Sequence, residues 1–312
     1  MSEEFYDVVI VGGGPAGLAC GQYSARAGRK TVVIEEMACG GQTMIIDEIE
    51  NYPGLEKISG YEIGARFESQ ASAFGCSFIY DGVVKIEKHK SGFTVTTASG
   101  KSIESSVVVI ATGSKHRQLE VPGENEYRGH GVSYCATCDG PFFRGKKILV
   151  CGGGDSAVQE AMYLTKLTDS VTVCHRRDRF RAQTAVVDKL KATGKALFKM
   201  NHTVVSINGQ DNRVKSVTFR DNSNNSEYTE EFDAVFVFVG NIPQTSLVPD
   251  CKKDNAGFII TDANMMTCVA GLYAIGDVRN TPFRQVVTAA ADGAIAAHAA
   301  SEYIDEIRGT VY

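Results

Sequence analysis

Short apolar runs alternate along this chain with amphipathic segments, in the order strand, helix, strand. Residues 7–11, Asp-Val-Val-Ile-Val, are typical of a buried parallel strand that leads into a glycine turn. An alanine-rich amphipathic segment follows at about residues 16–27, and the next apolar run occupies residues 31–35. This pattern predicts a βαβ unit, in which helices cover the faces of a parallel sheet.

The same pattern recurs at an offset of 140 residues between the glycine turns that begin at Gly12 and Gly152. The second copy predicts a helix that runs to about Leu167 and a strand over residues 170–175. Each copy continues with alternating segments, at residues 93–97 and 214–220, and ends in an apolar run followed by glycine. We therefore expect an α/β protein with two Rossmann-like domains.

A third kind of segment follows Gly240. Residues 271–277 resemble a strand that delivers an aspartate, and an alanine-rich helix is expected over residues 285–303. Because this tail has no partner in the second copy, we expect it to complete the first domain. The predicted division is residues 1–117 and 244–312 for one domain, with residues 118–243 inserted as the other.

Composition and charge argue against nucleic-acid binding and membrane insertion. The 312 residues carry a formal net charge of −5, whereas nucleic-acid binding usually requires a basic surface. No apolar run approaches the roughly 18–20 residues that span a bilayer, and the acidic start is unlike a signal peptide. We expect a cytoplasmic protein that binds neither nucleic acid nor membrane.

Both glycine turns carry a dinucleotide fingerprint. Gly12-x-Gly14-x-x-Gly17 follows a strand and opens a helix, the context in which backbone N–H groups and the helix dipole meet a pyrophosphate. The second turn, residues 152–157, has alanine in place of the third glycine. A plain turn is the alternative, which the flanking strands and helix disfavour.

The residues at the end of each second strand predict different cofactors. Glu35 lies 21 residues after Gly14, where a carboxylate accepts hydrogen bonds from ribose hydroxyls and repels phosphate, so this site suits FAD or NAD. His175 holds the same place after Gly154 and is followed directly by Arg176 and Arg177, with Arg181 one helical turn beyond. Arginine forks match phosphate oxygens, so the second site favours NADPH over a merely solvated basic surface.

Of the nine cysteines, one pair stands at an informative spacing, Cys135 and Cys138. The odd count argues against a structural disulfide framework, and Cys20, Cys151 and Cys174 lie in or beside apolar segments that predict buried thiols. A zinc site would need two further ligands, and none is suitably spaced. The pair is therefore predicted to undergo reversible oxidation, and no metal is expected.

Asp139 follows the second cysteine directly. An acid there is placed to move a proton to or from a nascent thiolate, whereas the alternative is an ordinary Asp-Gly turn. These parts predict one electron path. Because a disulfide is normally reduced through a flavin relay, the first site is predicted to bind FAD and the second NADPH. Residues 1–117 and 244–312 then form the FAD-binding domain, and residues 118–243 form the NADPH-binding domain with the cysteine pair.

These motifs, taken together, resemble those of the low-molecular-weight, bacterial-type thioredoxin reductases over nearly the whole chain. The residues that carry the resemblance are Gly12–Gly17, Gly40–Gln42, Glu50–Gly54, Ala111–Gly113, Cys135–Gly140, Gly152–Ala157, His175–Arg177 with Arg181, Gly276–Val278 and Arg284–Val286. Small flavin-dependent ferredoxin reductases share the two nucleotide folds but lack the cysteine pair. The resemblance implies NADPH-dependent reduction of oxidised thioredoxin through FAD and the Cys135/Cys138 disulfide.

The resemblance also assigns roles. Cys138 is expected to face the flavin, Cys135 to attack thioredoxin, Asp277 to lie near the ribityl chain, and Arg284–Val286 to lie near the flavin. The candidate FAD positions are Gly12, Gly14, Pro15, Ala16, Gly17, Glu35, Glu36, Gly40, Gly41, Gln42, Asn51, Val84, Ala111, Thr112, Gly113, Gly276, Asp277, Arg284, Gln285 and Val286. The candidate NADPH positions are Gly152, Gly153, Gly154, Asp155, Ser156, Ala157, His175, Arg176, Arg177, Arg181, Val239 and Gly240.

Members of this family are homodimers whose NADPH domain rotates against the FAD domain, and the same is expected here. Three alternatives remain open at this stage. The first is a reductase of another dithiol carrier. The second is a dithiol oxidase in which FAD passes electrons to oxygen, and the third is a nucleotide-sensing protein without turnover. Intact arginines disfavour the second alternative, and intact cysteines and glycines disfavour the third.

Overall fold

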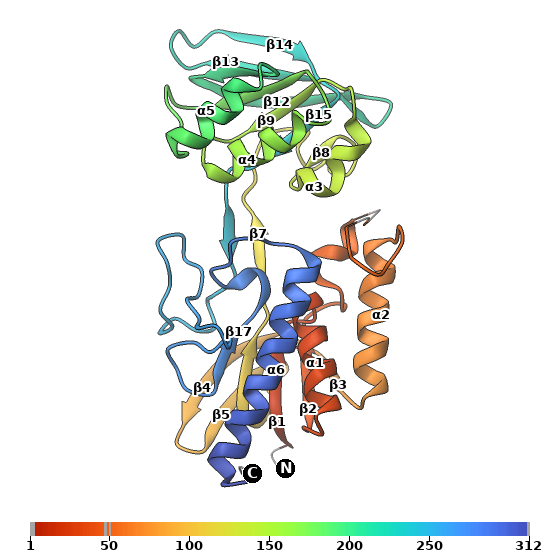
Figure 1. The fold of residues 1–312 in the computed structure, drawn as a ribbon, viewed down its shortest axis with the longest axis vertical. Coiled ribbons are helices and arrows are strands. Elements are labelled where there is room, and N and C mark those ends of the chain that lie inside the picture. The colour runs from red at the N-terminus through yellow and green to blue at the C-terminus, as the bar shows by residue number, and fades with distance from the viewer. Residues whose placement is uncertain (1–3, 47–48, 50, 311–312) are drawn as a thin grey trace. The chain divides into compact units, whose positions relative to one another are not determined.

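The computed structural model describes residues 4–46, 49 and 51–310. Contacts between Cα atoms divide the chain into two compact units (Figure 1). Unit 1 comprises Met1–Lys115 and Ile242–Tyr312, and unit 2 comprises His116–Asn241. One Rossmann-like domain is thus inserted into another, as the fold class predicted from the sequence requires.

Unit 1 is built on a seven-stranded sheet. Its path is β3-β2-β1-β6-β5-β4, and β17 pairs with the distal part of β6. β6 pairs in parallel with β1 and β17 but antiparallel with β5, so it joins the Rossmann strands to a meander. The strands are β1 (Glu4–Val11), β2 (Thr31–Glu35), β3 (Ser77–Tyr80), β4 (Val83–His89), β5 (Gly92–Thr97), β6 (Ser102–Ile110) and β17 (Leu272–Ala274).

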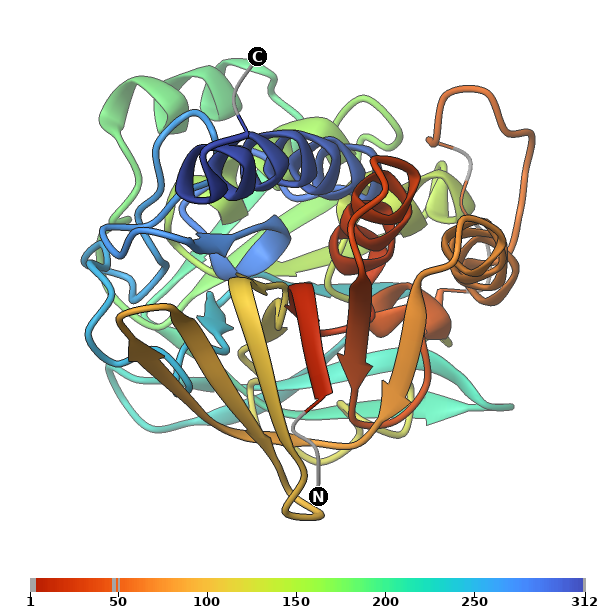
Figure 2. The same ribbon diagram turned by 90° about the horizontal axis from the view of Figure 1, so that it is seen from below.

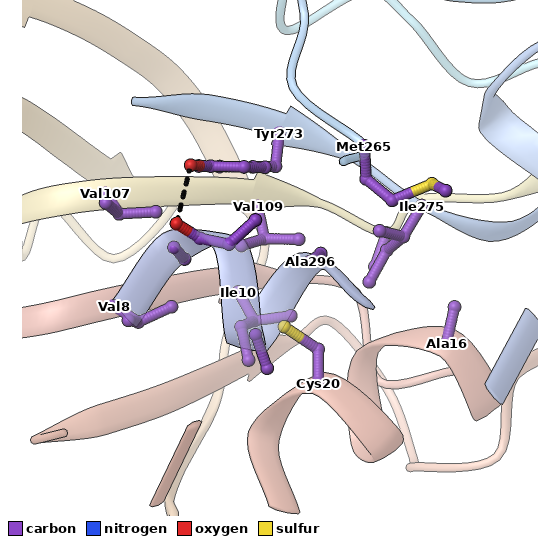
Figure 3. Close-up of a cluster of buried hydrophobic side chains, with 14 of the residues drawn as sticks. Val8, Ile10, Ala16, Cys20, Val107, Val109, Met265, Tyr273, Ile275 and Ala296 are labelled. Atoms are coloured by element: carbon purple, nitrogen blue, oxygen red, sulfur yellow. Dashed lines mark hydrogen bonds between the residues drawn. The ribbon is translucent and has the colours of Figure 1, made fainter. Parts of the chain in front are cut away.

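Helices α1 (Pro15–Arg26) and α6 (Val286–Arg308) pack together on one face of this sheet, and α2 (Gly60–Ala73) packs beside α1 (Figure 2). Alternate residues of β1 point to opposite faces, so Val8 and Ile10 meet these helices whereas Val9 and Val11 join a second cluster. In the helix-side cluster the Tyr273 hydroxyl donates to the carbonyl of Ala299 at 3.2 Å (Figure 3). The C-terminal segment that carries β17 and α6 therefore completes the hydrophobic core of unit 1, as expected from the sequence.

Unit 1 also contains two short 3₁₀ helices: η1 (Gly41–Ile45) and η3 (Gly276–Val278). The two chain crossings between the units carry the paired strands β7 (Ser114–His116) and β16 (Asn241–Pro243).

Unit 2 repeats the plan with a five-stranded parallel sheet, β11-β10-β9-β15-β8, and a three-stranded antiparallel sheet, β12-β13-β14. Its strands are β8 (Val132–Ser133), β9 (Ile148–Cys151), β10 (Val171–His175), β11 (Ala196–Met200), β12 (His202–Gln210), β13 (Arg213–Asp221), β14 (Glu227–Glu231) and β15 (Ala234–Val237). Its helices are α3 (Ala136–Asp139), η2 (Gly140–Phe143), α4 (Asp155–Leu164) and α5 (Thr184–Ala192).

The observed elements differ from the predicted ones in three respects. α4 ends at Leu164 rather than near Leu167, and α6 continues five residues beyond the predicted end, to Arg308. Gly309 stops α6 in the left-handed conformation that glycine favours, with a φ of 67°. Helices α2 and α5 were not predicted from the sequence.

Candidate nucleotide and disulfide sites

The first glycine turn brings a strand end, a helix start and a loop together in unit 1. A Cβ on Gly17 would lie 1.9 Å from the carbonyl oxygen of Gly12, so the turn is too tight for any side chain there. α1 begins at Pro15 without an acidic residue in its first turn, and no side chain in the described chain caps it. Its first N–H groups are therefore available to an anion.

Glu35 ends β2 beside this turn, as the fingerprint requires. Its carboxylate accepts hydrogen bonds from the N–H groups of Gly13 at 2.7 Å and Met37 at 3.1 Å. The loop that follows folds back on the turn: the N–H of Gly40 donates to the carbonyl of Gly13 at 2.7 Å. A Cβ on Gly14 would meet only the Cα of Gly41, at 3.9 Å, so this edge of the turn is open.

The turn that carries Asp277 lies against the same helix start. A Cβ on Gly276 would stand 2.9 Å from the Cβ of Ala16, in the first turn of α1. The N–H of Gly276 donates to the carboxylate of Asp292 at 3.0 Å, which anchors the turn to α6. The sequence predicted both segments, and the structure brings them together.

Asp277 and Arg284 form an electrostatic pair in unit 1. Burial raises the pKa of Asp277, and the opposite charge of Arg284 only partly offsets this effect. Arg284 lies over the ring of Phe258, 4.2 Å from its centroid, and burial lowers the pKa of its guanidinium. Its Nε is buried without a hydrogen-bond partner among the residues described here. An unpaired buried donor of this kind is suited to a polar ligand group.

The other candidate FAD positions lie around these elements. The Asn51 side chain donates to the Gln285 side chain at 3.1 Å, Thr112 donates to the carbonyl of Gln244 at 2.6 Å, and Gln42 donates to the carbonyl of Ser114. Ala111 is buried, whereas Glu36 and Val84 are exposed. Gln285 caps α6 and Val286 opens it.

The second glycine turn, in unit 2, has the same plan but different neighbours. Gly154 caps α4 without a side-chain hydrogen bond within the described chain, as Gly14 does for α1. Asp155, in the first turn of α4, accepts from the N–H of Gln183 at 2.8 Å. Ala157 is fully buried, Ser156 is exposed, and Val239 and Gly240 follow β15.

His175 covers this turn. A Cβ on Gly153 would fall 2.3 Å from the imidazole, which itself stacks on Phe180 with ring centroids 5.9 Å apart. Burial lowers the pKa of His175, and the charges of Arg181, Arg176 and Arg177 lower it further. Both effects favour the neutral form of the imidazole, and its buried Nε2 lacks a partner among the described residues.

The three arginines are exposed beside this covered turn. The N–H of Arg181 donates to the carbonyl of Gly153 at 2.7 Å, and its guanidinium Nη2 lies 4.0 Å from the position of a Cβ on Gly154. The loop is held at Arg176, whose carbonyl accepts from Asn222 at 3.1 Å. A cationic cluster at a helix start suits a phosphorylated ribose.

Cys135 and Cys138 are joined by a disulfide with a Cα–Cα distance of 5.3 Å. Both cysteines are half-buried in unit 2: Cys135 is the N-cap residue of α3, and Cys138 lies within that helix. The N–H of Cys138 points at the sulfur of Cys135, 3.2 Å away, and the Thr137 hydroxyl lies 3.5 Å from the same sulfur. A backbone donor so placed stabilises a thiolate on Cys135 once the disulfide opens.

Asp139 is tied to this pair through Ser133. The Ser133 hydroxyl donates to the Asp139 carboxylate at 2.5 Å and accepts from the N–H of Cys135 at 3.1 Å. Asp139 therefore stands in a hydrogen-bonded network with the first cysteine rather than in an isolated turn.

One buried carboxylate, Glu160, was not predicted from the sequence. Glu160, in α4, has a buried Oε2 without a partner among the described residues, and burial raises its pKa. No sequence signal marks it, because its burial depends on packing. The buried state predicted for Cys20, Cys151 and Cys174 is confirmed. Over the described ranges, no cluster of three or more His, Cys, Asp or Glu residues suits a metal ion.

Comparison with known proteins places this geometry in a family. Residues 6–293 match the pyridine nucleotide-disulphide oxidoreductase family. The chain is 48% identical to thioredoxin reductase of Treponema pallidum, over 98% of this chain and 99% of the relative, and 41% identical to that of Listeria innocua, over 98% and 96%. The solved structure of thioredoxin reductase from Streptococcus pyogenes matches with a TM-score of 0.91 and 43% identity, covering 98% and 100% of the two chains.

The fold and the disulfide thus define a pyridine nucleotide-disulphide oxidoreductase. Within that class, the chain belongs to the bacterial-type thioredoxin reductases, flavoproteins that use FAD and NADPH. The residues fit both cofactors: unit 1 offers an uncapped helix start and a buried orphan donor, and unit 2 offers a second uncapped start beside three arginines. No helix of the described residues has the length and apolar character of a membrane span.

Proposed function

We propose that this chain is an NADPH-dependent thioredoxin-disulfide reductase that acts through Cys135 and Cys138. The observation that carries the proposal is the disulfide in unit 2, the same unit as the arginine-flanked dinucleotide turn. Relatives over nearly the full chain bear the name thioredoxin reductase, which supports thioredoxin as the protein substrate.

The proposed cofactor positions follow the two glycine turns. The start of α1, Glu35 and the Asp277/Arg284 pair would hold FAD, and the start of α4, His175 and the three arginines would hold NADPH. A flavin bound there would supply two-electron redox chemistry between NADPH and a disulfide.

The reduced cysteine pair carries out the last step. The Cys135 thiolate attacks one sulfur of the thioredoxin disulfide and forms a mixed disulfide, while the second thioredoxin sulfur leaves as a thiolate. Cys138 then attacks Cys135, which restores the observed disulfide and releases dithiol thioredoxin. Two electrons pass to thioredoxin, and two protons are taken up by its thiolates. Asp139, linked to Cys135 through Ser133, would deliver one of them.

The decisive variant is Cys138→Ser. It should retain FAD and be reduced by NADPH, as seen by bleaching of the flavin absorbance, yet lose thioredoxin turnover. Cys268→Ser, a change at an exposed cysteine of unit 1, is the matched control and should keep turnover. Thioredoxin reduction by Cys138→Ser at the native rate would exclude the proposed route.

We also propose that two copies associate through unit 1 and that the protein resides in the cytoplasm. Large apolar side chains are exposed on the packed helices α1, α2 and α6, including Tyr23, Tyr61 and Ile295. Free thiols at seven cysteines suit a reducing compartment, which supports the cytoplasmic location.

The dimer is tested by light scattering. The native protein should give twice the mass of one chain, and Tyr61→Glu should lower the measured mass. A single-chain mass for the native protein would contradict the dimer.

A further inference from the structure

A second pair of cysteines, Cys251 and Cys268, lies close together in unit 1 and far from Cys135 and Cys138 in sequence. Cys268 is exposed, and its sulfur accepts from the N–H of Lys252 at 3.4 Å and lies 4.0 Å from the carbonyl oxygen of Asp250. These two residues flank Cys251. Because the Lys252 nitrogen is bonded to the carbonyl carbon of Cys251, bond lengths keep the Cys268 sulfur within about 6.5 Å of the Cys251 Cα.

Cys251 is the buried member of the pair. Only 6% of its surface is exposed, and the side chain of Thr267, the residue before Cys268, lies near enough to its thiol to lower the thiol pKa. Burial raises the pKa of Cys251, and the neighbouring Cys268 raises it further. One thiol therefore faces solvent while its neighbour is shielded from it.

The backbone around the pair is well ordered by hydrogen bonds. Lys253 and Ile259 form an antiparallel bridge, and the N–H of Ile260 donates to the carbonyl of Lys252 at 2.9 Å. On the other side, the N–H of Thr267 donates to the carbonyl of Leu272 at 2.9 Å. The proximity of the two cysteines thus follows from a paired framework rather than from a loose loop.

We propose that Cys251 and Cys268 form a second, reversible disulfide by exchange with low-molecular-weight disulfides. The Cys268 thiolate attacks a sulfur of the small disulfide, which releases one thiol and leaves a mixed disulfide on Cys268. Cys251 then attacks the Cys268 sulfur, and the second small thiol leaves. The two cysteines lose two electrons and two protons, and the small disulfide gains them as two thiols.

Closure of this disulfide would act on the neighbourhood of Asp277. Ile259 lies within the closed loop, and its N–H donates to the carbonyl of Val278 at 3.1 Å. Thr261, also within the loop, accepts from Arg279 at 2.9 Å. The oxidised pair would therefore secure the segment that supports the turn beside Asp277, and reduction would release it.

A third cysteine pair shows why exposure matters. Cys151 and Cys174 are partners on the neighbouring strands β9 and β10, but both are buried, with 2% and 4% of their surfaces exposed. A small disulfide has no access to either sulfur. This pair is therefore an internal control that stays reduced under conditions that oxidise Cys251 and Cys268.

The test uses the full chain, reduced and then freed of reductant, with glutathione disulfide as the probe. After quenching with a thiol-blocking reagent, peptide mass spectrometry should find Cys251 linked to Cys268 with two hydrogens lost. In Cys251→Ser and Cys251→Ala, glutathione should instead persist on Cys268, and in Cys268→Ser neither product should form. Two conservative changes at Cys251 guard against a folding artefact at one of them.

Two outcomes would overturn the proposal: glutathione that persists on Cys268 of the native chain, or a Cys268 that stays unmodified. The result is independent of thioredoxin turnover, because the readout is the linkage of two peptides in unit 1. The Cys138→Ser experiment can therefore fail while this one succeeds, and the reverse also holds.

Discussion

The two glycine turns are the most instructive comparison within this molecule. α1 begins at residue 15 and α4 at residue 155, and both starts lack a capping side chain in the described chain. Yet the third fingerprint position is Gly17 in one and Ala157 in the other. Gly17 faces the carbonyl of Gly12 at a distance that no Cβ tolerates, whereas Ala157 is accommodated and fully buried. The same fold thus permits two spacings between strand and helix.

The two turns also differ in the charge of the side chains beside them. Glu35 accepts the N–H of Gly13 in unit 1, while His175 covers Gly153 in unit 2 and three arginines stand nearby. A carboxylate repels a ribose phosphate, and guanidinium groups attract it. We therefore expect cofactor choice to be set at the end of the second strand, apart from the turn proposed to hold the pyrophosphate.

The largest predicted effect tests the difference in spacing. Gly17→Ala should destabilise unit 1 by about 3 kcal/mol or more, because the new methyl group overlaps the Gly12 carbonyl. Flavin absorbance per chain should fall to near zero, with a lower melting temperature.

Ala157→Gly is the reciprocal change and the control. It should cost only about 0.5–1 kcal/mol, as for glycine in a helix, and should leave NADPH binding nearly intact. Equal losses from the two substitutions, measured by thermal unfolding, would show that the turns are equivalent after all.

The second prediction tests the charge difference. Arg176→Ala and Arg177→Ala should each weaken NADPH binding by about 1.5–3 kcal/mol, the range for hydrogen bonds to charged groups, and should leave NADH binding nearly unchanged. The ratio of the two KM values is the measurement. Lys166→Ala, at an exposed lysine just beyond α4, serves as the control for loss of a positive charge in unit 2. Parallel losses for both nucleotides would contradict a role in reading the phosphate.

The smallest effect concerns Asp277, a carboxylate of unit 1 whose pKa is raised by burial. Because the pKa of Asp277 is raised in the folded protein, its ionisation costs stability above the folded pKa, and that cost disappears once pH falls below the unfolded pKa of about 4. Asp277→Asn in flavin-free protein should therefore raise the melting temperature near pH 7 by up to about 4 °C. The gain should shrink as pH is lowered, in scanning calorimetry at several pH values. A gain that stays constant with pH would argue against this carboxyl as its source.

Much of the fold could be predicted because its signals are local. The apolar run at residues 31–35 became β2, and the alanine-rich segment at about residues 16–27 became α1, with bounds Pro15–Arg26. α2 was missed because its buried face consists of Gly60, Ile63, Gly64 and Ala71, which leave little apolar periodicity. A stripe of small residues becomes meaningful only when a neighbouring helix is known.

The candidate sites likewise contain features that have a local sequence signal and features that depend on packing. Fingerprint glycines, arginines and the Cys-x-x-Cys spacing are sequence signals, and their roles in binding and transfer stay predictions. The proximity of Cys251 and Cys268 has no such signal, because it depends on the bridge between Lys253 and Ile259 and on the hydrogen bond from Thr267 to Leu272. Burial of Glu160 and the orphan Nε of Arg284 likewise depend on packing.

The insertion of unit 2 has a consequence for the order of assembly on the ribosome. All strands and helices of the inserted unit are synthesised before β17 and α6, the elements that finish the core around Val8 and Ile10. Synthesis of unit 1 therefore begins first but ends last. Its incomplete sheet persists while the 126 residues of unit 2 are translated. Nascent chains should therefore acquire the nicotinamide fold before they can retain a flavin.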